Sequence, residues 1–390
     1  MLDSIHIGAT GLLGYSKGLR VIANNTANMN TPGFKSSTLQ FSDMFYASGE
    51  RNSSHLGHGL NTASTTISFR QGDLRQTGND LDLAVDGQGM FILKSESGEL
   101  TYTRAGQFEF NKDGILVHKV TGQRVQGFDA EGNLADITIT GNRVNGAKAT
   151  KTIKFGGNIS STATAVQTIG GIKVIDSLGG EHTLTAKFTN TNSTTPGSFS
   201  VEFLDGTTSI GTGTIVFANG RPVAANSTIS LTYTPPGLPA MDLTMDFGTD
   251  VTSMASGSLA TVAMASQDGF GASTLTNASF DEKGVLVMTY ANGQTVNGSR
   301  LALGHTDSLA AIRPVGNNQF EAIDSSAWKI GSAGNGEFGN VQSGMIEVSN
   351  VDLSREFSEL VIMQRGYQAS SQIVSTANEM LQELFTMTSK

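Results

Sequence analysis

The sequence contains no cysteine, which excludes disulfide bonds and thiolate metal sites. Charged residues make up only 15 % of the 390 residues, well under the roughly one quarter that is usual for soluble domains, and proline occurs only 7 times. No apolar run approaches the roughly 18 residues that a membrane-spanning helix needs, so we expect no membrane insertion. The segment Met1–His6 lacks the basic start and the apolar stretch of a secretory signal peptide. We therefore expect any export to proceed without a cleaved signal.

What the chain has in quantity is glycine, at 47 residues, together with serine, threonine and asparagine. This composition favours many short strands joined by tight turns. Apolar residues occur in every segment, so we do not expect bulk disorder. The net charge of −9 disfavours nucleic acid as a partner. A chain of this length is expected to hold about two to four domains.

The C-terminal segment carries a heptad pattern, in which residues on one helix face recur at alternating steps of four and three. We predict one continuous helix of roughly 50 Å, at about 1.5 Å per residue, with Asp352 or Ser354 as its N-cap. The pattern comprises Leu353, Phe357, Leu360, Gln364, Tyr367, Ser371, Val374, Asn378, Leu381, Phe385 and Thr388.

Three polar members of this pattern lie one heptad apart: Gln364, Ser371 and Asn378. Repeated polar residues at such positions usually fix the register against partner helices. The alternative is that they line a water-filled channel, and the sequence leaves both roles open.

The N-terminal segment, residues 2 to 29, has the same periodicity. Its pattern comprises Leu2, Ile5, Ala9, Leu12, Ser16, Leu19, Ala23 and Thr26. Gly8, Gly11, Gly14 and Gly18 each cost an exposed helix about 1 kcal/mol relative to alanine, so this helix is marginal alone. Glycine also allows another backbone to come close.

One interpretation is that the two ends of one chain pair as a helical hairpin. Such a pair leaves most of each pattern in water, and every large apolar side chain left exposed forgoes roughly 1.5 to 3 kcal/mol. We therefore predict that copies of the same chain are further partners of these helices.

The end of the first helix carries a motif that resembles a known family. The run from Asn24 to Lys35, Asn-Asn-Thr-Ala-Asn-Met-Asn-Thr-Pro-Gly-Phe-Lys, is similar to the Asn-Asn-x-Ala-Asn-x-x-Thr-x-Gly-Phe-Lys motif of the bacterial flagellar rod and hook family. Residues 349–354 and 364–368 resemble the C-terminal motif of the same family, and residues 78–91 resemble a further family segment. Residues 172–184 resemble the outer domain of the hook branch, which the shorter rod proteins lack. This stretch favours a hook protein over a distal rod protein.

The resemblance implies a structural role and no enzymatic activity or cofactor. Copies of the chain would form a curved, hollow helical tube that couples the rod to the filament as a universal joint. The implied partners are further copies of the chain, the rod, hook cap and hook–filament junction proteins, and the flagellar type III export apparatus. The implied location is the basal body and hook of the flagellum, outside the cell.

The predicted fold is α+β and mainly β, with the terminal helices paired as a coiled-coil-like core domain. A β domain is built from two flanking halves, and an outer barrel-like or sandwich-like β domain is inserted into it. The predicted segments are 1–30 and 350–390 for the helical core, 31–71 and 330–349 for an extended connector, 72–145 and 269–329 for the inner β domain, and 146–268 for the inserted β domain. Glycine-rich Gly331–Gly344 is expected to act as a hinge.

A different class of function is a secreted β-rich carbohydrate-active enzyme or hydrolase. Asp176, Ser177 and His182 suggest a hydrolytic triad, but they lie in one short hairpin without a nucleophile elbow. His55 and His58 have no acidic or third histidine ligand nearby, so they predict a loop better than a metal site. We expect no catalytic, cofactor or metal residues.

The candidate site is therefore an assembly interface made by the chain ends. The predicted interface residues are Leu2, Ile5, Leu12, Leu19, Asn24, Asn25, Asn28, Gly33, Phe34, Phe357, Leu360, Gln364, Tyr367, Ser371, Val374, Asn378, Leu381 and Phe385.

Overall fold

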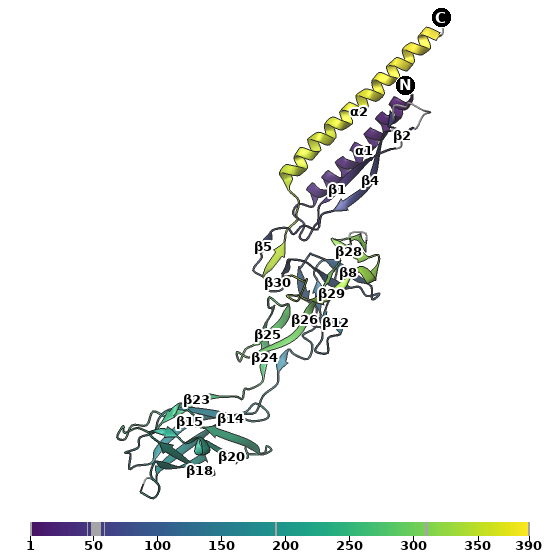
Figure 1. Ribbon diagram of the computed structural model, residues 1–390. Coiled ribbons are helices and arrows are strands. Elements are labelled where there is room, and N and C mark those ends of the chain that lie inside the picture. The colour runs from purple at the N-terminus through teal and green to yellow at the C-terminus, as the bar shows by residue number, and fades with distance from the viewer. Residues whose placement is uncertain are drawn as a thin grey trace. The chain divides into compact units, whose positions relative to one another are not determined.

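The computed structural model describes residues 2–44, 46–47, 56–57, 59–191, 193–308 and 311–388. Within them, α-helix is confined to the two ends and the rest is mainly strand, as predicted (Figure 1). The chain divides into two compact units. The first comprises Met1–Thr140, Ala278–Met288 and Val296–Lys390, and the second comprises Gly141–Asn277 and Thr289–Thr295. None of the described helices combines the length and the hydropathy that crossing a membrane requires.

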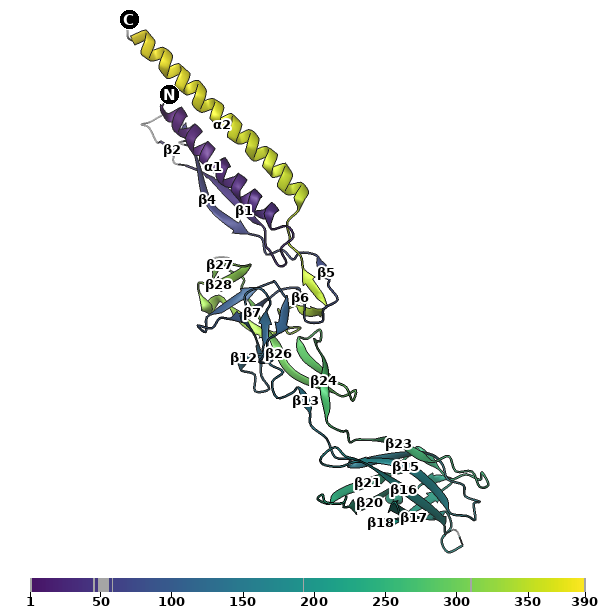
Figure 2. The same ribbon diagram turned by 180° about the vertical axis from the view of Figure 1, so that it is seen from behind.

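The terminal helices of the first unit are α1 (Leu2–Ala27) and α2 (Leu353–Thr388). They run antiparallel, and both views place α1 between α2 and a β-hairpin (Figures 1 and 2). The hairpin pairs β1 (Ser37–Asp43) with β4 (Leu60–Ile67), and β2 (Tyr46–Ala47) pairs with β3 (Leu56–Gly57). Residues 31–71 are thus not a simple extended connector. The strands of this hairpin are rich in serine and threonine, so their sequence lacks the clear apolar alternation that would predict strands.

Side chains define both helix ends at the base of the helical region. Asp352 is the N-cap of α2, because its Oδ1 accepts from the backbone N–H groups of Ser354 at 2.9 Å and Arg355 at 3.2 Å. At the end of α1, the Asn28 side chain donates to the backbone oxygen of Asn24 at 2.9 Å. The Asp352 contacts satisfy N–H groups that α2 leaves unpaired, and the Asn28 contact adds to the backbone bond that Asn24 already accepts from the Asn28 N–H at 3.1 Å.

The β part of the first unit is one large antiparallel sheet with short satellite pairs. Its central order is β24-β25-β26-β11-β7-β8-β28-β27, with β13 beside β24, β29 beside β26, β10 and β12 beside β11, and β9 beside β10. The strands are β7 (Met90–Lys94), β8 (Leu100–Thr103), β9 (Phe108–Phe110), β10 (Leu116–His118), β11 (Arg124–Phe128), β12 (Leu134–Asp136), β13 (Val144–Asn145), β24 (Ser273–Phe280), β25 (Val285–Tyr290), β26 (Thr295–His305), β27 (Ile312–Gly316), β28 (Gln319–Ala322) and β29 (Lys329–Ser332). Strands β24 to β26 pass from one unit into the other, and β13 belongs to the second unit.

Two further strand pairs join early and late parts of the chain. β5 (Leu74–Gln76) pairs with β31 (Met345–Glu347), and β6 (Leu83–Asp86) pairs with β30 (Asn340–Ser343). The expected hinge Gly331–Gly344 includes the end of β29 and all of β30, and its role as a hinge stays a prediction. Two of its glycines pack closely: a Cβ on Gly331 would collide with the Phe338 ring, and one on Gly339 would collide with the Asp86 backbone.

The second unit is a β-sandwich. One sheet has the order β15-β16-β17-β18-β19, and the other has the order β20-β21-β14-β22 with β23 beside β14. The strands are β14 (Thr152–Asn158), β15 (Gln167–Ile175), β16 (Glu181–Asn190), β17 (Ser198–Asp205), β18 (Thr208–Ala218), β19 (Arg221–Pro222), β20 (Thr228–Tyr233), β21 (Met241–Asp246), β22 (Val251–Thr252) and β23 (Ala263–Gln267). Alternate residues of both sheets fill one core, in which Phe155 stacks on Phe247 with ring centroids 4.5 Å apart.

Candidate assembly site

The first helix contacts its neighbours through glycine. Gly8, Gly11 and Gly18 face α2, and a Cβ atom built on them would lie 2.6, 2.6 and 2.8 Å from α2 side chains. Gly14 faces the hairpin, where the added atom would lie 2.7 Å from Leu60. The glycines that weaken α1 as a lone helix therefore let it pack closely on both sides.

The single glycine of α2 has a matching role. A Cβ on Gly366 would collide with the ring of Tyr15 from α1. The Tyr15 ring also contacts Phe41 of β1, with centroids 5.9 Å apart. Tyr15 thus fills the space between α2 and the hairpin, and Gly366 provides that space.

The face by which the helices pair inside one chain lies one residue before most of the predicted heptad positions. Its buried residues are Gly8, Gly11, Gly18, Ile22 and Asn25 of α1, and Glu356, Ser370 and Ala377 of α2. The heptad face takes part in this contact at Val374, which an added Cβ on Gly8 would meet, and its role in contacts to other copies stays a prediction. The helices approach along their smallest residues, because only there can the backbones come close.

The predicted interface residues fall on the flanks and the outside of this pair. Half-buried at the flanks are Ile5, Leu12, Leu19, Leu360, Val374 and Leu381. Exposed are Asn24, Phe357, Gln364, Tyr367, Ser371, Asn378 and Phe385. The side chain of Leu2 lies outside the described residues, as do His55 and His58. The heptad face of α2 therefore stays largely uncovered within one chain.

Large apolar side chains gather on the uncovered part of α2. Phe357 is 54 % exposed and Phe385 is 69 % exposed. Other exposed members are Leu353, Val361, Ile362, Ile373, Met380, Leu384 and Met387. Covering such a side chain is worth roughly 1.5 to 3 kcal/mol, so this surface favours association with further apolar helices.

Asn25 is buried inside the chain and joins three elements. Its Oδ1 accepts from the Ser37 N–H at 3.0 Å, and its Nδ2 donates to the Ser37 oxygen at 2.8 Å. Nδ2 also donates to Glu356 Oε1 at 3.0 Å. The carboxamide thus pairs with the edge of β1 as a further strand would. The prediction of Asn25 as a contact to other copies is corrected, since its groups are used within one chain.

Glu356 is the acidic residue of this contact and is also buried. Burial raises the pKa of its carboxyl group, although the hydrogen bond from Asn25 acts in the opposite direction. Its Oε2 has no hydrogen-bond partner among the described residues. The base of the helix pair therefore favours the neutral form of this carboxyl group.

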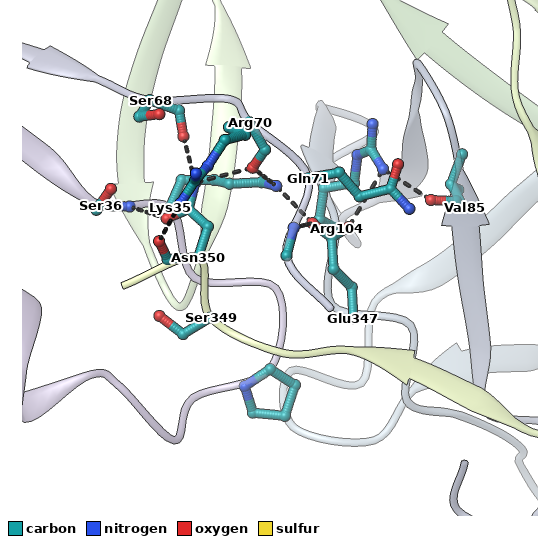
Figure 3. Close-up of polar contacts among 12 residues, drawn as sticks. Lys35, Ser36, Ser68, Arg70, Gln71, Val85, Arg104, Glu347, Ser349 and Asn350 are labelled. Carbon is teal, nitrogen blue, oxygen red and sulfur yellow. Dashed lines mark hydrogen bonds and ion pairs between the residues drawn. The ribbon is translucent and has the colours of Figure 1, made fainter. Parts of the chain in front are cut away.

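Below the helices, three charged side chains from distant segments meet (Figure 3). Glu347 is fully buried, and its carboxylate oxygens lie 2.5 Å from Lys35 Nζ and 3.2 Å from Arg104 Nη1. The same carboxylate accepts from the Gly72 N–H at 2.8 Å. Burial lowers the pKa of Lys35 and of Arg104, and the charge of Glu347 opposes this in both. One carboxylate thus holds two buried cations and ties β31 to the end of the N-terminal motif.

The Asn350 carboxamide, like that of Asn25, bonds to backbone N–H and C=O groups as a neighbouring strand would (Figure 3). It accepts from the Ser36 N–H at 2.7 Å and donates to the oxygens of Ser68 and Arg70, each at 2.8 Å. Gly33 is buried beside it with φ of +69°, and an added Cβ would lie 2.5 Å from the Ala105 nitrogen. Gly33 is therefore also an internal residue and not a surface contact as predicted.

Two other predicted motif residues lie at the surface of this junction. Phe34 is half-buried, and its oxygen accepts from the Asn350 N–H at 3.4 Å. Asn28 is half-buried, and its Oδ1 accepts from the Thr31 hydroxyl at 3.2 Å. Both end α1 and lead the chain into β1.

Sequence reasoning missed Glu347, Arg104 and Glu356. Lys35 and Asn350 stand inside the quoted family motifs, which was a signal that they have fixed partners. Glu347 and Arg104 have no local pattern, because their contact joins segments far apart in the sequence.

The candidate catalytic residues of the second unit form a turn. Asp176 Oδ2 lies 2.8 Å from His182 Nε2, and this hydrogen bond lowers the pKa of Asp176. Asp176 Oδ1 accepts from the N–H groups of Leu178 and Gly180 at 2.8 Å each. Ser177 is exposed. Across the part of the chain that the structure describes, no three histidine, aspartate or glutamate side chains group as metal ligands.

Models of protein families match three segments of the chain. Residues 6–35 match the model described as flagella basal body rod protein, and residues 84–161 match the flagellar hook protein FlgE/F/G D1 domain. Residues 342–387 match the C-terminal model of the flagellar basal body rod FlgEFG proteins.

Curated relatives match over nearly the whole length. The flagellar hook protein FlgE of Borreliella burgdorferi is 29 % identical, with 98 % of this chain and 99 % of the relative covered. FlgE of Salmonella typhimurium is 29 % identical, with 97 % and 98 % covered. Among solved structures, the flagellar hook protein FlgE2 of Helicobacter pylori covers 70 % of this chain and 100 % of its own, with a TM-score of 0.51 at 13 % identity. That likeness shows a common fold.

Proposed function

The chain belongs to the flagellar hook protein family, and on this basis we propose that it is the structural subunit of a flagellar hook. Copies assemble into a curved, hollow helical tube that acts as a universal joint and transmits torque from rod to filament. The distal rod alternative is not carried forward, because the relatives that match the full length are named hook proteins.

The observation that carries the proposal is the uncovered apolar face of α2. One chain pairs its helices through glycine and leaves Phe357 and Phe385 at the surface. An open, head-to-tail contact between identical chains generates a helical filament, so helices from neighbouring copies are suitable partners for this face. In this proposal Leu360, Val374 and Leu381 hold neighbouring helices together.

Two roles fit the exposed polar residues Gln364, Ser371 and Asn378. In the first they set the register between neighbouring helices, and in the second they line the channel of the tube. We favour the register role, because the three repeat on the heptad face itself. Alanine at all three positions should then give tubes of irregular diameter, whereas channel-lining residues would leave the tubes unchanged.

For the domains, we propose that residues 1–30 and 350–390 form the helical core of the tube wall. The inner β domain, 72–145 and 269–329, and the inserted β domain, 146–268, then lie at larger radius. Residues 31–71 and 330–349 connect core and β domain, through the hairpin and the buried cluster at Glu347.

The proposed partners are the rod, hook cap and hook–filament junction proteins and the type III export apparatus. The location is the hook, outside the cell, with export that needs no cleaved signal peptide. The chain has no cysteine, so export in a largely unfolded state would need no disulfide to form afterwards.

Negative-stain microscopy of the purified, concentrated chain tests the proposal. The full chain should form tubes, and chains that lack residues 1–27 or 353–390 should not. A secreted enzyme would instead stay monomeric, with chain ends that resist protease. Full-length and trimmed chains that polymerise equally well would contradict the proposed function.

A further inference from the structure

One apolar side chain of the second unit is held out into solvent by a fixed turn. Leu178 lies between β15 and β16 and is 75 % exposed. The N–H groups of Leu178 and Gly180 both donate to Asp176 Oδ1, and His182 holds the other carboxylate oxygen. Asp176 is itself buried. The turn is therefore ordered before it meets a partner, and docking it would cost little further ordering.

At the opposite end of β15, two loops form a groove of about 510 Å³. Residues 162–168 form one wall and residues 257–260 form the other, and none of them is charged. Val166 and Leu259 are 52 % and 71 % exposed there. The groove is larger than one side chain needs, so it has room for the tip of a turn.

Hydrogen bonds hold both walls in place. The Gln167 carboxamide accepts from the Ser160 N–H at 3.0 Å and donates to the Ser160 oxygen at 3.2 Å. Ser256 N–H donates to Ser160 Oγ at 3.2 Å, which links the two loops. The Ser256 hydroxyl donates to the Leu259 oxygen at 2.6 Å. The groove is thus formed without an occupant.

The turn and the groove cannot meet within one chain. β15 begins at Gln167, in the groove wall, and ends at Ile175, just before the turn. Its 9 residues span about 30 Å at roughly 3.3 Å per residue. Only a second copy can bring a Leu178 turn to this groove. A projecting leucine at one end and, at the other, a preformed uncharged groove that holds the apolar side chains of Val166 and Leu259 give a head-to-tail contact that repeats from copy to copy.

We propose that the Leu178 turn of one copy docks into the groove between residues 162–168 and 257–260 of a neighbouring copy. This contact rests on the proposed self-assembly and names the surface that the second units use for it. The docked segment Ser177–Gly180 and the groove are both uncharged, so the contact removes no unpaired charge from water.

The absence of cysteine allows a direct test. Tubes are assembled from a chain that carries Leu178→Cys and Leu259→Cys, oxidised, and separated by denaturing electrophoresis without reductant. We expect a ladder of covalent dimers, trimers and longer chains. The matched control combines Leu259→Cys with Val120→Cys, because Val120 is an apolar residue of the first unit that is 71 % exposed and belongs to neither surface. It should give no ladder.

Tubes of the first double variant with no more cross-linking than the control would overturn the proposed contact. Failure of the unmodified chain to form tubes would instead count against the proposed function. If only the double variant fails to assemble, chains with Leu178→Cys and chains with Leu259→Cys are mixed into an excess of unmodified chain. A covalent dimer then supports the contact, and its absence overturns it.

Discussion

Phenylalanine side chains are buried in the second unit and exposed on the C-terminal helix. Phe155 and Phe247 stack in the sandwich core and are buried. Phe357 and Phe385 stand at the surface of α2. The sandwich has therefore completed its core within one chain, whereas α2 has an apolar face that one chain leaves uncovered. The difference indicates that assembly adds more buried surface to the helices than to the sandwich core.

A matched pair of substitutions should show this contrast most strongly. Phe155→Ala leaves a cavity in the sandwich core and should lower the free energy of unfolding of the second unit by about 3 to 5 kcal/mol. Phe357→Ala should change the stability of the monomer by less than about 0.5 kcal/mol, because the ring is exposed. Denaturant unfolding of the monomer measures both.

The exposed residue should matter for assembly, although it matters little for the stability of the monomer. Phe357→Ala should raise the concentration at which tubes appear, measured by sedimentation, while the monomer stays folded. If Phe357→Ala lowered monomer stability as much as Phe155→Ala does, the α2 face would have a partner within the chain, and the comparison would fail.

The buried charge cluster should respond almost as strongly as the sandwich core. Glu347→Gln keeps the shape but leaves Lys35 and Arg104 without a counter-charge, which should cost about 3 to 5 kcal/mol. The matched control is Glu321→Gln, whose pair with Arg313 lies at the surface and should matter little. Thermal unfolding measures both variants. Equal falls in melting temperature for Glu347→Gln and Glu321→Gln would contradict the importance of the cluster.

A smaller effect is expected where α1 and α2 touch. Alanine usually stabilises a helix relative to glycine by about 1 kcal/mol. Gly366→Ala should instead destabilise the helix pair by about 1 to 3 kcal/mol, because the added methyl group meets the Tyr15 ring. Helix melting followed by circular dichroism measures this, with Ser371→Ala on the exposed face as the control. A gain in melting temperature for Gly366→Ala would show that the pair is loose.

Acid should produce the smallest effect, with opposite signs in the two regions. Burial raises the pKa of Glu356 above its usual 4.5, so its contribution is complete below the unfolded-state pKa and is lost as pH rises through the folded-state pKa. Burial lowers the pKa of His118 below its usual 6.5, so its contribution is complete above that value and is lost as pH falls through the folded-state pKa. Acidification from neutral pH should therefore strengthen helix pairing and weaken the sheet that holds His118.

Two signals separate these regions. Circular dichroism follows the helices, and fluorescence of the only tryptophan, Trp328, follows the sheet, where it stacks on Tyr102. Glu356→Gln should abolish the gain in helix stability without changing the tryptophan signal. Loss of helix on acidification in the unmodified chain would contradict the assignment to Glu356.

Much of the fold could be predicted because its signals are local. Alternating apolar residues predict strands at 199–203 and 229–233, and both are found. Asn219-Gly220 predicts a hairpin turn, and both residues have positive φ. The β1–β4 hairpin could not be predicted in the same way, because its strands are rich in serine and threonine and its apolar partner is a helix.

The site could be predicted only in part because its contacts join distant segments. Heptad spacing located both helices and the apolar face of α2. It did not show that glycines would make the contact within the chain, since spacing reports which residues share a face and not which face comes closest. The partners of Asn25 and of Glu347 depend on how three segments meet, and no local pattern carries that information.

Amide hydrogen exchange of monomer and tube tests the central claim most directly. The account predicts that amides of α2 exchange rapidly in the monomer and become strongly protected in the tube, while the core strands of the second unit are equally protected in both. Equal protection of α2 in monomer and tube would show that one chain already satisfies its helices, and would contradict the account.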